Sequence, residues 1–379
     1  MIQHERFILA MVPALLSGNL RGLFSARILS AKSIEHGPRK FIMSAVTPVS
    51  SSLPPIAESR IFIPVIRGDP TSPEMTLQIL SCRPATTDSV SDNEKKKRPL
   101  LFLHGSFHSA WCYSERYLPY FASHGYDSYA YSFRGTGPSP VLGPDGKIDG
   151  SITKVKIDEH VDDLASILET FDRRPVVVAH SFGGAVLMKY MEGRHRDGTG
   201  PEPSGIALLC SVPPSGNGKM TRRFLRRSLV ASYRITVGFV AKKLTSDADL
   251  CRTLFFDGSV PPEDLTMYMG LYARDSSVTI DVVDFAKNKL PSLCADERGV
   301  APWAMNAALP PPRLVLGANK DYVVDKEGVE ETGKFLDTDA VWVNSPHDVM
   351  LGGKWEEGAR AIRSWLEGGT DSCITPDDF

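Results

Sequence analysis

A regular alternation of short apolar runs with helical patterns, which begins at Pro99, constrains the fold of this 379-residue chain more than any other feature. Each run is continuously apolar, as in parallel strands that are buried on both faces of a sheet. The spacing predicts strands at 100–103, 128–132, 175–178, 206–210, 313–316 and 341–343. It predicts helices at 111–123, 159–171, 184–193 and 353–368. We therefore predict an α/β fold with a mostly parallel central sheet and helices on both faces.

The alternation stops between residues 212 and 304, where the pattern is helical and contains no convincing buried strand. An insertion at this point in a βα series predicts a helical cap at 213–304, over the carboxyl edge of the sheet. The cap separates two parts of the core, at 53–212 and 305–379. Ahead of the first parallel strand, strand-like runs at 60–67 and 75–82 flank Gly68-Asp69-Pro70 and predict a hairpin.

The first 52 residues differ in composition from the rest of the chain. They carry six basic and two acidic residues and are rich in serine. A basic, Ser-rich and acid-poor leader is typical of an organelle transit peptide. A secretory signal and a plain disordered tail are the alternatives, although the positive charges fall mainly after the apolar run at 7–16 and not before it.

Composition and charge exclude several classes of protein. The net charge of −2 and the 42% hydrophobic content are ordinary for a globular protein and do not point to nucleic acid. No apolar run reaches the roughly 18 residues that a membrane-spanning helix needs. The six cysteines form no C-x-x-C pair or Cys/His cluster, so we expect reduced thiols and no metal site.

The segment Val176-Val177-Val178-Ala179-His180-Ser181-Phe182-Gly183-Gly184 carries the strongest chemical signal. An apolar strand runs directly into a serine that has a small residue two positions away on each side, and a helical pattern follows. This is typical of a nucleophile elbow, a sharp turn that presents a serine hydroxyl above the sheet. Ala179 stands where glycine is the commonest residue. The helix behind Ser181 would direct its amino-terminal dipole at developing negative charge.

A serine nucleophile needs a base and an acid that orients the base, and both follow in the chain. Asp321 lies just after the predicted strand at 313–316, and His347 lies just after the strand at 341–343. All three side chains are therefore predicted at the carboxyl ends of parallel strands, where open α/β sheets bind their ligands. Asp325 and Asp348 are nearby alternatives for the acid.

An oxyanion hole would need two backbone N–H groups near Ser181. We expect one from Phe182, the residue after the nucleophile. The other is expected from Ser106, in the loop His104-Gly105-Ser106-Phe107-His108 after the first parallel strand. His108 and His180 are candidates for lining the substrate pocket, with simple packing as the equal alternative.

These motifs, in this order, resemble the α/β-hydrolase superfamily over residues 60–366. The 104–111 and 179–184 segments are similar to plant carboxylesterases and methylesterases, and the turn at 133–139 resembles the family's R-G-x-G-x-S element. The resemblance implies an α/β-hydrolase fold and a serine hydrolase for a small or lipid-like carboxylic ester, with no cofactor. A lyase or an acyltransferase on the same triad, or a ligand receptor without turnover, are the alternatives. Labelling by a fluorophosphonate probe that depends on Ser181 would distinguish the enzymatic hypotheses from the receptor hypothesis.

The start of the cap is strongly basic, with Lys219, Arg222, Arg223, Arg226 and Arg227 close together. A solvated cap face is the simpler interpretation of this cluster. The alternatives are weak association with an anionic membrane surface and attraction of an acidic substrate. The sequence does not indicate an oligomeric state.

The resemblance to plant-type enzymes makes the chloroplast the first expectation for the leader, with the mitochondrion or, for a mere disordered tail, the cytoplasm as alternatives. We expect residues 1–60 fused to a fluorescent protein to enter chloroplasts and to be shortened there. Microscopy and the size of the recovered protein check this. A fusion that stays at full length in the cytoplasm would contradict it.

Overall fold

The computed structural model describes residues 54–64, 74–85, 97–143, 145–198, 200–305 and 312–368, all within one compact unit that begins at Pro54. The leader at 1–52 and the predicted turn at 68–70 lie outside the described residues, so the transit peptide stays a prediction. Among the described residues, no helix is long and apolar enough to cross a membrane.

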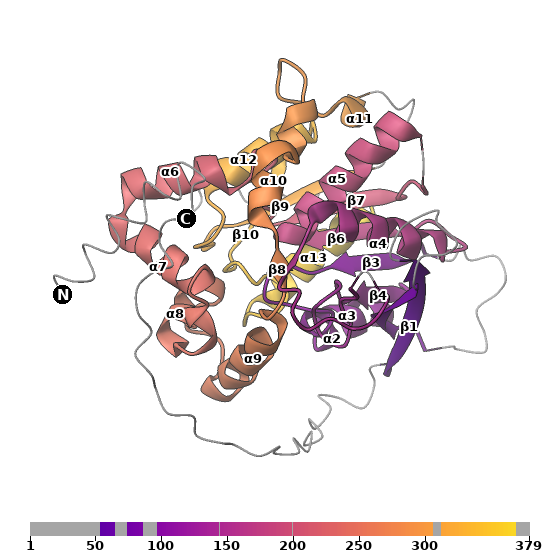
Figure 1. The fold of residues 1–379 in the computed structure, drawn as a ribbon, viewed down its shortest axis with the longest axis horizontal. Helices are drawn as coiled ribbons and strands as arrows, with labels where there is room; N and C mark the ends of the chain where they lie inside the picture. Colours follow the sequence, from indigo (N-terminus) through magenta and orange to yellow (C-terminus); the bar gives the residue numbers. More distant parts are fainter. Residues whose placement is uncertain are drawn as a thin grey trace. The chain divides into compact units, whose positions relative to one another are not determined.

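An eight-stranded sheet forms the centre of the unit, in the order β1-β2-β4-β3-β6-β7-β9-β10 (Figure 1). Only β2 runs against the others, because β1 and β4 both pair with it in antiparallel fashion and the remaining pairs are parallel. The strands are β1 (Ile56–Pro64), β2 (Glu74–Cys82), β3 (Leu100–Leu103), β4 (Ser128–Tyr131), β6 (Val176–His180), β7 (Gly205–Leu209), β9 (Arg313–Ala318) and β10 (Ala340–Val343). The predicted mostly parallel sheet is confirmed.

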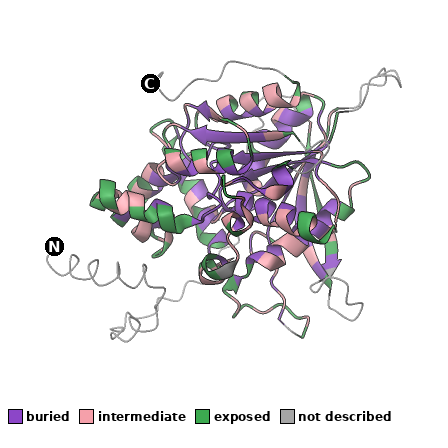
Figure 2. Cartoon of the chain, turned by 90° about the horizontal axis from the view of Figure 1, so that it is seen from above, coloured by how far each residue is buried: buried purple, intermediate pink, exposed green. Residues whose placement is uncertain are grey.

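Helices cover both faces of this sheet because successive strand residues point to opposite sides. Leu101 and Leu103 pack on one face with α4 (Ile157–Glu169), α5 (Phe182–Asp197) and α12 (Lys326–Phe335). Leu100 and Phe102 pack on the other face with α2 (Trp111–Ser114), α3 (Tyr117–Ser123) and α13 (Trp355–Leu366). The central strands are consequently buried along their whole length (Figure 2).

Two helices differ from the sequence-based prediction for identifiable reasons. The predicted helix at 111–123 is split at Glu115 and Arg116 into α2 and α3. Pro119 explains the break, since a proline ring clashes with the carbonyl four residues earlier and supplies no N–H. Helix α12 was not predicted, because its segment contains two glycines and few apolar side chains. Asp325 caps it by accepting a hydrogen bond from the Gly328 amide.

The segment between β7 and β9 is mainly helical. It contains α6 (Asn217–Arg227), α7 (Leu229–Phe239), η1 (Lys243–Thr245), α8 (Ala248–Phe255), α9 (Pro262–Asp275), α10 (Val282–Asn288), η2 (Pro291–Cys294) and α11 (Pro302–Met305). As expected, no buried strand occurs among its described residues. It contains one short strand that is only partly buried, β8 (Thr279–Ile280), which pairs in parallel with β5 (Lys154–Val155) and is too short to produce a sequence pattern.

Buried charges fix the turn at 133–139 and connect it to this helical segment. Arg134 donates hydrogen bonds to Asp163 and Glu159 of α4, and burial raises the pKa of Asp163 to about 6 although Arg134 opposes the shift. The Gly137 amide donates to Asp275 at the end of α9, which also accepts a hydrogen bond from the Trp111 indole. Asp275 therefore joins the end of α9 to both this turn and α2.

Candidate active site

Ser181 occupies a sharp turn between β6 and α5. Its backbone has φ 52° and ψ −117°, which lies in a region that side chains rarely adopt. The Ser181 amide donates to the carbonyl of Leu209 at 2.9 Å, and the Val212 amide donates to the Ser181 carbonyl at 3.0 Å. Backbone strain of this kind, of order 1–3 kcal/mol, persists only where the surroundings enforce it, and it is common at functional sites.

Two glycines permit the close packing around this turn. A Cβ atom on Gly183 would lie 2.7 Å from the carbonyl oxygen of His104, and one on Gly105 would lie 2.8 Å from the Cβ atom of Ser181. Both contacts are shorter than atoms tolerate. Position 179 accommodates the methyl group of alanine, which is fully buried in the core.

His347 and Asp321 meet Ser181 at the carboxyl ends of the strands. His347 Nε2 lies 3.2 Å from the hydroxyl of Ser181, and His347 Nδ1 lies 2.8 Å from Asp321 Oδ2. Because a carboxylate only accepts, Nδ1 carries the hydrogen and Nε2 is free to accept the hydroxyl proton. The other carboxylate oxygen of Asp321 accepts from the amides of Val323 and Val324, which fixes its orientation.

The alternative acids have other partners. Asp325 accepts two hydrogen bonds of 2.6 Å from Arg223, and Asp348 binds His108. The structure thus brings together the serine, histidine and aspartate that the sequence order selects.

Opposing effects set the protonation of His347. Burial lowers the pKa of the ring, but the charge and the hydrogen bond of Asp321, with a further contribution from Asp348, outweigh it. The net result is a pKa above the ordinary value of about 6.5. His347 therefore takes up a proton more readily than a histidine in solution.

The two expected oxyanion donors come from two separate segments near the serine. Phe182 is the first residue of α5, where the amide has no partner within the helix and the dipole is positive. Ser106 lies in the loop after β3, beside Gly105, which approaches Ser181. Phe107 has a positive φ of 69°, so this loop too is held in an unusual conformation.

His108 stabilises this loop through two hydrogen bonds. Its Nδ1 lies 2.8 Å from the carbonyl oxygen of Ser106, and its Nε2 lies 2.9 Å from Asp348 Oδ2. The ring therefore connects the backbone of the Ser106 loop to a buried carboxylate. Tyr272 of α9 also donates to Asp348 Oδ2, at 2.7 Å. Burial raises the pKa of Asp348, but the charge and hydrogen bond of His108 outweigh it and the carboxyl stays ionised.

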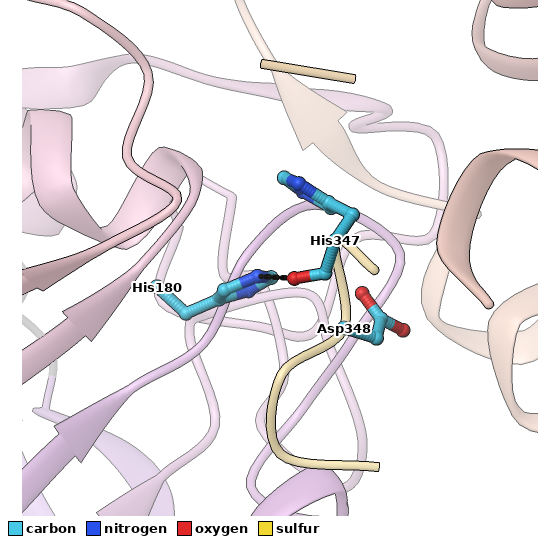
Figure 3. Close-up of side chains that lie close together, drawn as sticks. All are labelled: His180, His347 and Asp348. Carbon is cyan, nitrogen blue, oxygen red and sulfur yellow. Dashed lines mark hydrogen bonds between the residues drawn. The ribbon is translucent and has the colours of Figure 1, made fainter. Parts of the chain in front are cut away.

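His180 supports the backbone of the histidine instead of presenting its ring to solvent. Its Nε2 donates to the carbonyl oxygen of His347 at 3.0 Å (Figure 3). Burial, with a contribution from His347, lowers the pKa of His180 well below its ordinary value, so the ring is neutral. Both rings predicted to line the pocket, His108 and His180, are almost completely buried and have structural partners. That either touches substrate stays a prediction.

The close approach of His180, His347 and Asp348 could suggest a cation site. Their donor sets argue against that interpretation. Both ring nitrogens of His347 are engaged by Ser181 and Asp321, which leaves this histidine no atom for a cation. His180 Nε2 binds a carbonyl and Asp348 Oδ2 accepts two hydrogen bonds, while His180 Nδ1 and Asp348 Oδ1 have no hydrogen-bond partner among the described residues. The described cluster is better understood as a hydrogen-bond network.

Aromatic side chains of the helical segment cover the three residues. Phe255 of α8 stacks on the ring of His347, with ring centroids 5.9 Å apart, and Phe239 of α7 contacts both Phe255 and Phe107. Only 9% of Ser181 and 2% of His347 is exposed, so the site is shielded from water. Sequence reasoning missed these aromatic residues and Tyr272, because nothing in the helical pattern of the insertion indicates which residues face the sheet. The sequence did indicate Asp348, next to His347, but only as an alternative to Asp321 for the acid of the triad.

Comparisons with known proteins agree with this architecture. Solved structures that resemble the chain include a bromoperoxidase from Bacillus anthracis (16% identity, 82% of this chain and all of that chain, TM-score 0.53) and an esterase from Exiguobacterium antarcticum (14%, 81% and 98%, TM-score 0.53). A laboratory-evolved variant of potato epoxide hydrolase is similar too (15%, 82% and 100%, TM-score 0.51). At these identities the likeness shows the fold alone. No curated protein sequence matches the chain.

The sequence model of one family, described as the alpha/beta hydrolase family, matches residues 100–362. That range runs from β3 into α13 and includes the elbow, the loop after β3 and the histidine loop. The chain therefore belongs to the alpha/beta hydrolase family.

Proposed function

We propose that this protein hydrolyses carboxylic esters of small or lipid-like substrates, with Ser181 as nucleophile, His347 as base and Asp321 as the orienting acid. The observation that carries the proposal is the unbroken line of hydrogen bonds from Asp321 through His347 to Ser181, at 2.8 and 3.2 Å. It ends on a serine held in a strained turn at the amino terminus of a 16-residue helix.

The reaction begins when the Ser181 hydroxyl attacks the ester carbonyl and His347 Nε2 takes the hydroxyl proton. Asp321 stabilises the imidazolium that forms, and the amides of Ser106 and Phe182 donate to the developing oxyanion. His347 then gives its proton to the departing alcohol, which leaves an acyl group on Ser181. The same histidine activates water for attack on the acyl-enzyme, which releases the acid and restores the serine.

A fluorophosphonate probe tests the nucleophile directly. We expect the wild-type protein to be labelled and Ser181→Ala to be unlabelled, with hydrolysis of p-nitrophenyl esters reduced at least about 10⁴-fold. Ser123→Ala, a change at an exposed serine far along the chain from the elbow, is the matched control and should be labelled like the wild type. A folded wild type that resists the probe would contradict the proposal. A series of esters of increasing acyl length would then separate esterase from lipase-like preference.

The pH profile follows from the protonation of His347. The reaction needs the neutral ring, and the pKa of this ring is raised, so kcat/KM should rise with pH through a midpoint above about 6.5. Asp321→Asn removes the charge that contributes most to raising the pKa. In that variant we expect a lower rate and a midpoint at lower pH. An unchanged midpoint in Asp321→Asn would contradict the proposal that Asp321 raises the pKa of His347.

Positioning of the Ser106 amide should depend on the pair of His108 and Asp348. We expect the double variant His108→Phe/Asp348→Leu, which removes both hydrogen-bonding side chains together, to lose about 10- to 100-fold in kcat with little change in KM. Asp348→Asn should stay within about threefold of wild type, because its amide can donate to His108 Nε2 and leave the bond to the Ser106 carbonyl intact. Steady-state kinetics on a soluble ester measure both variants. A wild-type kcat in the double variant would contradict the proposal that this pair positions the Ser106 amide.

A further inference from the structure

Helices α6 and α7 and the turn η1 form the most basic part of the described structure. Residues 217–246 carry eight lysines and arginines and no acidic residue, although the whole chain has a net charge of −2. Both helices lie at one side of the unit (Figure 1), joined through Ser228, which ends α6 and caps α7.

Part of this charge is neutralised within the fold. Arg223 binds Asp325 through two hydrogen bonds, and Arg227 binds Asp325 and Glu327. Lys219, Arg222 and Arg226 are exposed and have no carboxylate partner in the part of the chain that the structure describes. Ion pairs within the fold thus account for two of the five basic residues singled out in the sequence, and the other three face outward.

The outer face of α7 is apolar, which the basic cluster alone did not suggest. Leu229 is 74% exposed, Val230 61% and Tyr233 42%, and Val240 at the end of the helix is 59% exposed. Steps of four and seven residues place Leu229, Tyr233 and Val240 along one stripe of the helix. The stripe faces outward, because its side chains are exposed and Gly238 on the opposite side of the helix is buried.

The opposite side of α7 reaches the site. Phe239 at the end of the helix contacts Phe107 of the loop after β3 and Phe255, the residue stacked on His347. One helix therefore contributes both to the cover of the triad and to this apolar surface.

Charge decides which occupant fits the surface. A second copy of the protein would set one basic segment against another, and the leader at 1–52 is basic as well. The combination of an apolar helix face with unpaired basic residues beside it matches a helix that lies in the interface of an anionic bilayer. In that arrangement the apolar side chains enter the acyl boundary and the basic side chains remain among the phosphates.

We propose that α6 and α7 dock this protein on an anionic membrane surface. Leu229, Val230, Tyr233 and Val240 insert into the interface, and Lys219, Arg222 and Arg226 contact the headgroups. This docking does not depend on the proposed esterase activity.

Sedimentation of the full chain with vesicles tests the docking. We expect binding to phosphatidylcholine vesicles that contain phosphatidylglycerol and little binding to phosphatidylcholine alone. The variant Leu229→Ser/Val230→Ser/Tyr233→Ser should partition at least about tenfold less. Arg222→Gln/Arg226→Gln should lose about fivefold for each charge removed. Leu229→Trp should show a blue-shifted emission with the anionic vesicles only.

Matched controls exclude a general effect of surface substitution. Leu293→Ser changes a leucine that is 64% exposed in η2, and Lys147→Gln changes a lysine whose side chain is 84% exposed. Both should bind like the wild type. Thermal unfolding establishes that every variant is folded.

Three results would overturn the proposal. They are equal binding of the wild type to neutral and anionic vesicles, wild-type binding by the triple serine variant, or conversion of a wild-type dimer to a monomer by that variant with no difference on vesicles. The second would assign binding to another part of the chain, and the third would assign the surface to self-association.

Discussion

The contact between Gly183 and the carbonyl of His104 is the steric constraint on which the rest of the site depends. Because position 183 carries no side chain, the first turn of α5 lies directly against the end of β3. The strained backbone of Ser181 lies between these two segments, and Gly105 of the Ser106 loop approaches Ser181 equally closely. Two close approaches that only glycine allows therefore bring the nucleophile and both expected oxyanion donors into one small region.

Four histidines within this small region have different roles because their partners differ. Burial lowers the pKa of His104 to about 3, and the Phe133 amide donates to its Nε2, so this ring is neutral. Burial keeps His180 neutral as well, whereas His108 bridges the Ser106 carbonyl and Asp348. Only His347 combines a raised pKa with a nitrogen that faces a hydroxyl. Burial alone would not separate these rings, since all four are almost inaccessible.

Sequence patterns predicted the sheet well, because continuous apolar runs are a direct consequence of burial on two faces. They also selected Ser181, Asp321 and His347 by their places after strands, and the structure brings these side chains into contact. The break at Pro119 could have been predicted from proline chemistry. The partnership of Asp348 with His108 and Tyr272 could not, since it joins three distant segments through tertiary packing. The apolar outer face of α7 could not be predicted for the same reason. Apolar residues occur on every side of this helix, so its sequence does not indicate which side is covered.

Ala179 has a consequence for how proteins of this kind are found. The residue lies between β3 and β7, paired with Leu103 and Leu208, and its side chain is buried in the core on the face that α5 covers. The first position of the elbow thus requires a small side chain and not the absence of one, whereas Gly183 has no room for even a methyl group. A literal text search for Gly-x-Ser-x-Gly would pass over this chain. A search weighted by the space at each position would retain it.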